Sequence, residues 1–152
     1  MKALAALVLC LLCGCTSLRE SAHGATALDA ATTAAGVASG VAVEANPLIG
    51  SPIAFAGVML ARVIGVEVAD KLDEPQRTQT LAGLNSLWWG VGVSNVLVLL
   101  AASNPVGLIA GAMAGLGWWA STADQREFSS LCASERLANP RLQCTFNGKD
   151  LL

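Results

Sequence analysis

The sequence predicts an all-α fold, a small transmembrane helical bundle with a short C-terminal tail. Apolar residues make up 54% of the 152-residue chain and charged residues only 13%, which is about half the charged share of an ordinary soluble domain. The stretch from Thr78 to Ala123 carries no charged residue at all. The length fits one domain. The composition excludes a disordered chain, a basic protein that binds nucleic acid and a typical cytosolic enzyme.

Residues 1–14 are typical of an export signal. Lys2 provides a charged start, the run from Ala3 to Leu12 is apolar, and small residues follow it. This order of features is that of a secretory signal peptide. The apolar run is too short to cross a bilayer, because a crossing helix needs about 20 residues.

The signal ends in the motif Leu12-Cys13-Gly14-Cys15. This motif resembles the bacterial lipobox, in which Leu, a small residue, and Gly or Ala precede a cysteine. The resemblance implies that Cys15 is the lipid-modified first residue of the mature chain, that 15–24 is a lipidated linker, and that membrane lipid is a partner. The alternative is a plain signal, cleaved or uncleaved, that contains cysteines.

Two spans are expected in the first half of the mature chain. The first covers residues 25–43 and contains Asp29, and its alternative is an interfacial or periplasmic helix that does not cross. The second covers residues 52–69, where Ser51 can cap the helix and Pro52 suits its first turn. The bundle therefore has four spans, or three if the first does not cross.

The long uncharged run predicts a second hairpin. As one helix it would be about 69 Å long, more than twice the ~30 Å hydrocarbon core. We expect it to fold back at Ser103-Asn104-Pro105, a turn signal near its middle. Helices at 78–102 and 105–122 then complete a bundle over residues 25–123.

Small residues recur four apart on three of the expected helices. Such rows lie on one helix face and let two backbones approach closely, which favours helix association inside a bilayer. The partner of each row is a helix of the same chain, a second copy, or another membrane protein. The rows are Gly36 and Gly40; Gly57, Ala61 and Gly65; and Gly107, Gly111 and Gly115.

Two charges inside the membrane are expected to form an ion pair. If the first hairpin turns near residue 47, Arg62 comes level with residues 32–34, and its side chain reaches Asp29 or Thr33. Ionisable groups at such depth cost about 2.5–3.5 kcal/mol on insertion scales and usually pair. The pair is either a structural tie that fixes the register of the hairpin, or part of a path for a proton, an ion or a substrate.

The same hairpin carries a wider pattern of polar residues: an Asp and Thr early in the first span, an Asn-Pro turn, and a basic residue in the second span. Its members are Asp29, Thr32, Thr33, Glu44, Asn46, Pro47 and Arg62. Over roughly residues 28–100 this pattern resembles a group of small bacterial membrane proteins of unknown function. The resemblance implies a membrane hairpin and no particular activity.

The four tryptophans form two adjacent pairs, Trp88-Trp89 and Trp118-Trp119. If the last hairpin turns near residue 104, the two pairs lie at one depth. Trp prefers the boundary between water and hydrocarbon, so the pairs predict an aromatic belt on the charged side. The alternative is a stacked aromatic core within the bundle.

Two arguments about membrane topology conflict. Apart from Arg62, every Lys and Arg of the mature chain lies on the side of the signal remnant, the loop 70–79 and the tail. The positive-inside rule would make that side cytoplasmic, whereas lipid attachment at Cys15 requires export. We favour the external, periplasmic side, in the inner membrane of a bacterial cell.

Residues 124–152 form the expected soluble tail. A short amphipathic helix is predicted from 124 to 138, ended by Asn139-Pro140. Cys132 and Cys144 are expected to pair in an oxidising compartment. Closing this short loop contributes about 3 kcal/mol.

The sequence shows no nucleophile–base–acid set, glycine-rich phosphate loop or histidine constellation. We therefore expect no enzymatic activity, no cofactor and no metal site. The favoured class is a structural or interaction protein, such as an accessory subunit, an envelope factor or a phage-type exclusion factor. The alternatives are a small pore or holin-like oligomer, and a minimal transporter component that uses Asp29 and Arg62.

Overall fold

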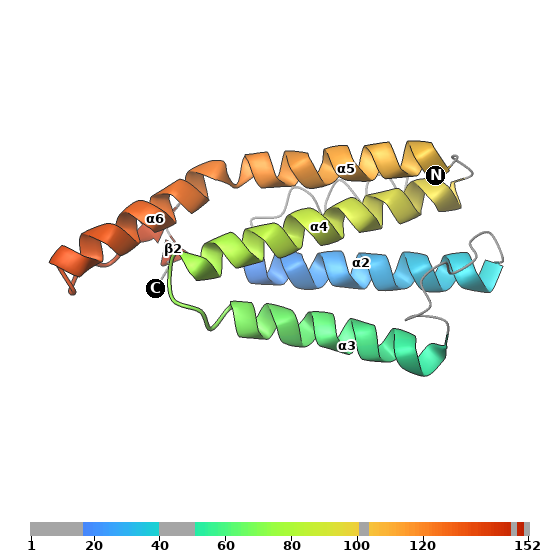
Figure 1. Cartoon of the computed structure of the whole chain (residues 1–152), viewed down its shortest axis with the longest axis horizontal. Helices are drawn as coiled ribbons and strands as arrows, with labels where there is room; N and C mark the ends of the chain where they lie inside the picture. Colours follow the sequence, from blue (N-terminus) through green and yellow to red (C-terminus); the bar gives the residue numbers. More distant parts are fainter. Residues whose placement is uncertain (1–16, 40–50, 101–103, 147–148, 151–152) are drawn as a thin grey trace.

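The structure, a computed structural model, describes residues 17–39, 51–100, 104–146 and 149–150. In these residues four helices lie side by side in alternating directions, and a further helix continues from the last of them at one end (Figure 1). The prediction of an all-α helical bundle is confirmed. The elements are α2 (Leu18–Ser39), α3 (Pro52–Ala69), α4 (Gln76–Leu99), α5 (Asn104–Ser121), α6 (Ala123–Ala138), β1 (Thr145–Phe146) and β2 (Lys149–Asp150).

Local capping explains where the first two described helices begin. Glu20 Oε2 accepts from the Ser17 backbone N–H at 2.9 Å, and Ser17 Oγ accepts from the Glu20 backbone N–H at 3.2 Å, a reciprocal capping box. This box starts α2 at Leu18, so the end of the expected linker is helical. Ser51 Oγ caps α3 by accepting from the Ala54 N–H at 3.1 Å, as the sequence predicts.

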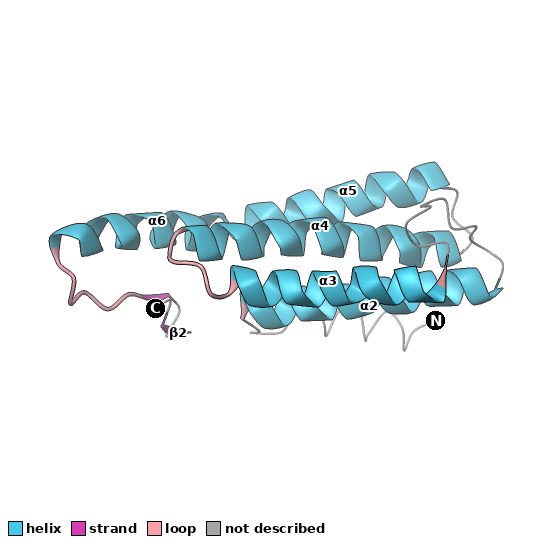
Figure 2. Cartoon of the chain, turned by 60° about the horizontal axis from the view of Figure 1, so that its bottom comes forward, coloured by secondary structure: helices cyan, strands magenta, loops and turns pink. Residues whose placement is uncertain are grey.

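Helix α4 is the centre of the bundle. It packs against α5 on one side and against α2 and α3 on the other (Figure 2). The apolar core forms where these helices meet, in the half of the bundle near the start of α4. Its buried members are Ala22, Ala25, Val66, Ala69, Leu81, Trp88 and Trp89.

By length and composition, α3 and α4 are each able to cross a membrane. The α5–α6 pair makes a third candidate if the two helices, bent by 41° at their junction, count as one span. Helix α2, which contains the described part of the expected span 25–43, is not among the candidates. Its buried side carries Ser21, Thr26 and Asp29 beside the core residues Ala22 and Ala25.

Large apolar side chains cover the outer faces of α3 and α5. Ile53, Leu108 and Met113 are each more than two-thirds exposed. A soluble monomer rarely exposes apolar faces of this extent, whereas lipid tails are as apolar as these side chains. The faces agree with the membrane class predicted from composition.

The tail folds as a helix followed by a small ribbon. Helix α6 covers the predicted range 124–138, and β1 pairs antiparallel with β2, with Thr145 opposite Asp150. The Phe128 and Phe146 rings lie 5.5 Å apart and join the helix to the ribbon. The sequence analysis did not predict the ribbon, although Asn147-Gly148 between the strands is a common hairpin dipeptide.

Candidate functional site

The most unusual site is a buried carboxylate where α2, α3 and α4 meet. Arg62 on α3 donates from Nη1 to Oδ2 of Asp29, so the structure brings together the two residues expected to pair. Asn95 on α4 donates from Nδ2 to Asp29 Oδ1 at 2.7 Å. The Thr33 hydroxyl also lies 3.5 Å from Oδ1. Each oxygen of this carboxylate therefore has a hydrogen-bond partner from another helix.

Arg62 is held by a second contact besides the carboxylate. Its guanidinium carbon lies 5.6 Å from the centre of the Trp88 ring, within the range of a cation–π interaction. The Arg62 side chain is 21% exposed and the Asp29 side chain 4%. The cation thus sits at the margin of the bundle, while the anion is enclosed by it.

Polar contacts continue along the line between α2 and α4. Asn85 is fully buried, and its Nδ2 donates to the carbonyl oxygens of Leu18 and Leu81, both at 2.8 Å. Trp89 Nε1 donates to Ser21 Oγ at 3.0 Å. We call these side chains, together with those around the carboxylate, the polar seam: Ser21, Asp29, Thr33, Asn85, Trp89 and Asn95.

The polar seam explains how a helix as polar as α2 joins an apolar bundle. In hydrocarbon an unsatisfied polar group costs several kcal/mol, so polar groups of the seam are turned toward partners on the facing helix. Asn85 Oδ1 is buried without a hydrogen-bond partner among the described residues. Interhelical hydrogen bonds in membrane proteins contribute on average ~0.6 kcal/mol each. The seam therefore fixes which face of α2 meets α4 more than it adds stability.

Several charged side chains form ion pairs at the end of the bundle where α2 starts. Arg19 Nη2 donates to both carboxylate oxygens of Glu67, at 2.8 and 2.9 Å, and His23 Nε2 lies 2.9 Å from Glu67 Oε1. Arg77, in the first turn of α4, donates from Nη2 to Asp70 Oδ1 at the end of α3, at 2.6 Å. The Arg19 and Glu67 side chains are 44% and 39% exposed, so this pair is weak. It lies at the C-terminal end of α3.

The two tryptophan pairs do lie at one depth, but they do not form a belt. Trp89 stacks on Trp118 with ring centres 5.8 Å apart, and Trp88 and Trp89 are buried. Only Trp119 is exposed, and Arg126 covers its ring at 3.5 Å. The expectation of an aromatic belt is wrong for the pair on α4, because that helix is central and covered by its neighbours.

The glycine row on α5 packs against α4 of the same chain. A Cβ added at Gly111 would lie 2.5 Å from the carbonyl oxygen of Gly90, and one at Gly115 would lie 2.6 Å from that of Ser86. Gly107 meets the Ser94 carbonyl oxygen in the same way, at 3.0 Å. The facing row on α4, with Ser86, Gly90 and Ser94 spaced four apart, was missed in the sequence analysis. Its signal was the same spacing of small residues.

The other two glycine rows have different surroundings. Around Gly57 and Gly65 on α3, nothing lies within 4 Å of an added Cβ. This row is therefore open in the described part of the chain. Gly36 is buried in α2, and Gly40 lies outside the described residues.

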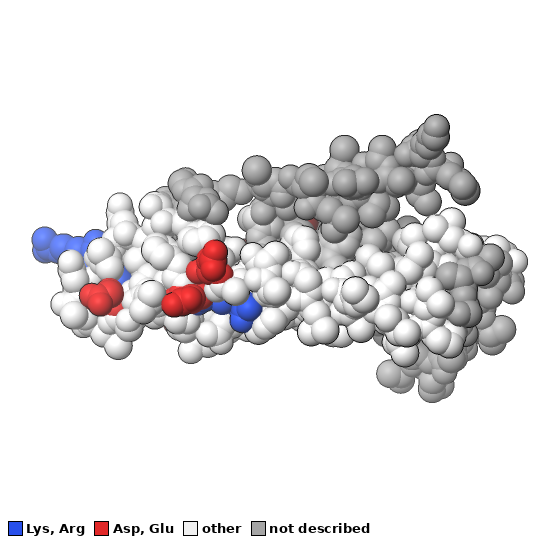
Figure 3. All heavy atoms as spheres, turned by 90° about the horizontal axis from the view of Figure 1, so that it is seen from above, with Lys and Arg blue, Asp and Glu red and all other residues white. Residues whose placement is uncertain are grey.

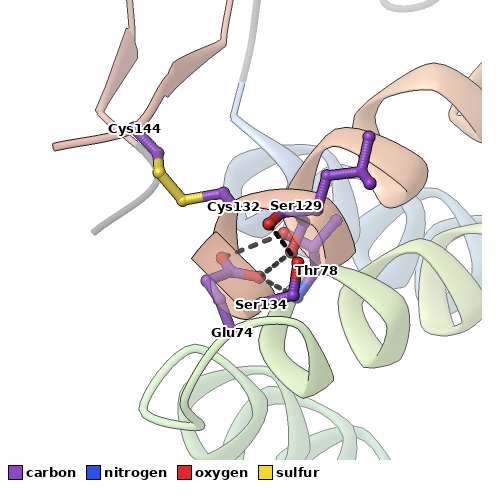
Figure 4. The surroundings of a disulfide bond; sticks show 7 residues. Glu74, Thr78, Ser129, Cys132, Ser134 and Cys144 are labelled. Carbon is purple, nitrogen blue, oxygen red and sulfur yellow. Dashed lines mark hydrogen bonds between the residues drawn. A yellow bond between two sulfur atoms is a disulfide. The ribbon is translucent and has the colours of Figure 1, made fainter. Parts of the chain in front are cut away.

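Glu74 connects the loop before α4 to the tail (Figure 4). Its carboxylate accepts from the backbone N–H and the hydroxyl of Thr78, at 3.2 and 2.9 Å, and so caps α4. It also accepts from Ser129 Oγ on α6 at 2.6 Å. One turn further along α6, Cys132 is bonded to Cys144 with a Cα–Cα distance of 6.2 Å, which confirms the predicted disulfide. The helix α6 is thus tied to both the bundle and the ribbon.

Several sequence predictions remain outside what the structure describes. Cys15 and the turn residues Glu44, Asn46 and Pro47 lie outside the described residues. In the described part, no group of three or more His, Cys, Asp or Glu side chains is placed to hold a metal ion. Asn85, Asn95 and Glu74 were missed, although an amide inside an uncharged span is itself a signal, because it must find a partner there.

Fold and seam together define the class: a small helical-bundle protein with helices able to cross a membrane and a buried ion pair among them. No protein-family model, curated protein or solved structure matches the chain.

Proposed function

We propose that this chain is a non-enzymatic integral membrane protein of structural or interaction type. It is anchored by lipid at Cys15 in the inner membrane of a bacterium and holds a disulfide-tied tail on the periplasmic side. Its role is that of an accessory subunit, an envelope factor or a phage-type exclusion factor. The observation that carries the proposal is the complete engagement of the Asp29 carboxylate by Arg62 and Asn95.

A carboxylate that passes on a proton or an ion must be reached by water or by substrate. Asp29 is 3% exposed, and its two oxygens are directed at donors from α3 and α4. Buried ion pairs of this kind are best attested as devices that fix register. This geometry favours a structural tie over a minimal transporter built on Asp29 and Arg62.

The connection of the tail to the bundle supports the same function. Glu74, 2% exposed at its side chain, accepts from Ser129, and the disulfide holds the ribbon on α6. A tail that served only as a tether would need neither contact. We infer that the tail is folded and held in a fixed position at one end of the bundle.

One observation favours a pore or holin-like oligomer as the second candidate. The row of Gly57, Ala61 and Gly65 on α3 is open, and large apolar side chains such as Ile53, Leu60 and Ile64 are exposed along the same helix. Rows of small residues let helices of separate copies approach closely. Packing of several copies through α3 would be the basis of such an assembly.

Reconstitution into liposomes separates these functions. We expect liposomes that contain the purified chain to retain a trapped dye and a potassium gradient as well as protein-free liposomes do, at every protein-to-lipid ratio. Leakage that rises steeply with protein density, and that Gly57→Leu removes, would contradict the structural function and support the pore. A gradient-driven flux abolished by Asp29→Asn, in protein that remains folded, would support the transporter.

A further inference from the structure

A small hollow lies at the far end of the tail, where α6 turns back toward the ribbon. Its volume is about 320 Å³, and it is lined by Arg136, Pro140, Arg141, Leu142 and Gln143. No acidic side chain is among the described residues that line it. Ligand pockets begin at roughly this size, so the hollow suits one small polar group.

The two arginines of this hollow differ from the other described arginines. Arg19, Arg62 and Arg77 are held by carboxylates, and Arg126 lies on the Trp119 ring. In the described part of the chain, the guanidinium groups of Arg136 and Arg141 have neither an ion-pair partner nor a hydrogen-bond partner. Two arginine side chains therefore line one hollow, and none of the described residues that line it is acidic.

The disulfide and a closed turn hold these two cations in place. Arg136 follows Cys132 by four residues, so the two share one face of α6. Cys144 brings the returning chain onto that face through the disulfide. The return is a turn in which Leu142 N–H donates to the Asn139 carbonyl oxygen at 3.0 Å, with Pro140 at its second position, where proline is favoured. Arg141 occupies the third position of this turn.

We propose that this hollow is a binding site for an oxyanion of the phosphate type. The planar fork of a guanidinium matches the oxygens of phosphate and donates two parallel hydrogen bonds to them. Arginine keeps its charge at any physiological pH, so the site stays cationic throughout. Figure 3 shows basic side chains at the outer end of the molecule, where α6 ends, with an acidic side chain on the same face nearby.

The position of the hollow indicates where the phosphate comes from. Helix α6 has 16 residues and is therefore about 24 Å long, and it leaves the apolar helix α5 at an angle of 41°. Arg136 lies near its distal end. If α5 crosses the membrane without α6, the headgroups lie near the start of α6. We then expect a phosphate group in solution rather than a headgroup of the same bilayer.

The test uses the full chain in nanodiscs of zwitterionic lipid, with inorganic phosphate as the probe. Binding is followed through the arginine side-chain NMR signals. We expect saturable shifts of Arg136 and Arg141, and a loss of affinity of roughly tenfold in each of Arg136→Gln and Arg141→Gln, because each removes a charge-assisted hydrogen bond. Arg136→Lys keeps the charge but loses the fork, so it should bind more weakly than the native chain.

Lys71→Gln is the matched control, since Lys71 is an exposed basic residue outside the hollow. It should bind phosphate like the native chain. Native affinity in the Arg136→Gln/Arg141→Gln double variant, with the disulfide intact, would overturn the site. An equal loss in Lys71→Gln would overturn it as well, because net charge alone would then explain binding. Competition by phosphatidylglycerol in the nanodisc would support the same site with a headgroup as its source.

Discussion

Asp29 is a carboxylate held almost entirely away from water, and the residues around it replace the hydrogen bonds that water would make. Arg62 supplies the opposite charge, and Asn95 supplies a neutral donor at 2.7 Å. Removing one member leaves a buried group without its partner, which is far more harmful than losing an exposed pair. This contrast makes the ion pair testable at the level of single residues.

Asp29→Asn and Arg62→Gln should each destabilise the protein by about 3–5 kcal/mol, the usual effect of breaking a buried pair. We expect lower protein levels in membranes and a lower melting temperature in detergent. The exchange Asp29→Arg with Arg62→Asp should restore part of the loss, because it restores the pair in reverse.

Arg19→Gln is the control for this prediction. Its partner Glu67 is about as exposed as Arg19 itself, so we expect little or no loss of stability. No loss in either single variant at the ion pair, or no recovery on exchange, would contradict the pairing as a structural tie.

At the scale of elements, α3 and α5 each carry a row of small residues spaced four apart, but only the row on α5 contacts a neighbouring helix. The row on α5 is filled by the backbone of α4, whereas the row on α3 is open. An added methyl group therefore meets a carbonyl oxygen on one helix and free space on the other. The same substitution on α5 and on α3 therefore measures what the close contact between α4 and α5 contributes to stability.

Gly111→Ala should destabilise the bundle by about 1–3 kcal/mol, the usual range for overpacking, because the new Cβ would lie 2.5 Å from the Gly90 carbonyl oxygen. Gly57→Ala should leave stability unchanged or raise it slightly, since Ala is the better helix former. Thermal unfolding of the purified variants in detergent measures both.

Equal effects of the two changes would contradict the packing described here. A large loss at Gly57 with none at Gly111 would indicate that α3, and not α5, makes the close helix contact. The size of oligomers in detergent then reports whether Gly57 faces a second copy.

At the scale of the whole molecule, the open question is which side of the membrane carries the tail. We propose the periplasmic side, where Cys132 and Cys144 meet an oxidising compartment. On the cytoplasmic side the same two thiols would stay reduced. The redox state of this pair in living cells therefore reports the orientation of the bundle.

Alkylation of intact cells under non-reducing conditions should label neither Cys132 nor Cys144, and both should become reactive after reduction. Mass spectrometry of the tail peptides provides the measurement. The variant Cys132→Ser exposes a single thiol at Cys144, which a membrane-impermeant reagent should then reach from outside. Two freely reactive thiols in the native chain would contradict both the bond in cells and the external tail.

The anchor is a separate prediction about the whole molecule. The mature chain should begin at Cys15 with a diacyl or triacyl modification, because the motif that precedes it resembles a lipobox. Mass spectrometry of the purified N-terminus measures this directly, and Cys15→Ser should abolish both cleavage and lipid attachment. A chain that retains Met1 would contradict the anchor and reverse the favoured topology.

The sequence by itself determined the helices and their order. Uncharged runs too long for one crossing, Ser51 as a cap, and Asn139-Pro140 as a stop are local signals, and the boundaries of α3 and α6 agree with them closely. The ion pair of Asp29 and Arg62 was also predictable, because the length of a hairpin fixes which residues come level. Signals of this kind depend on neighbours along the chain.

Only the tertiary structure decided which faces meet. Asn95 completes the site from a third helix, the row of Ser86, Gly90 and Ser94 receives the glycines of α5, and Trp89 stacks in the core instead of facing lipid. By length and composition two described helices, or three if α5 and α6 count as one span, are able to cross a membrane, and α2 is not among them. The physical reason is that the rotation of each helix about its axis is set by contacts with its neighbours, and inside an apolar medium hydrogen bonding and close packing decide those contacts.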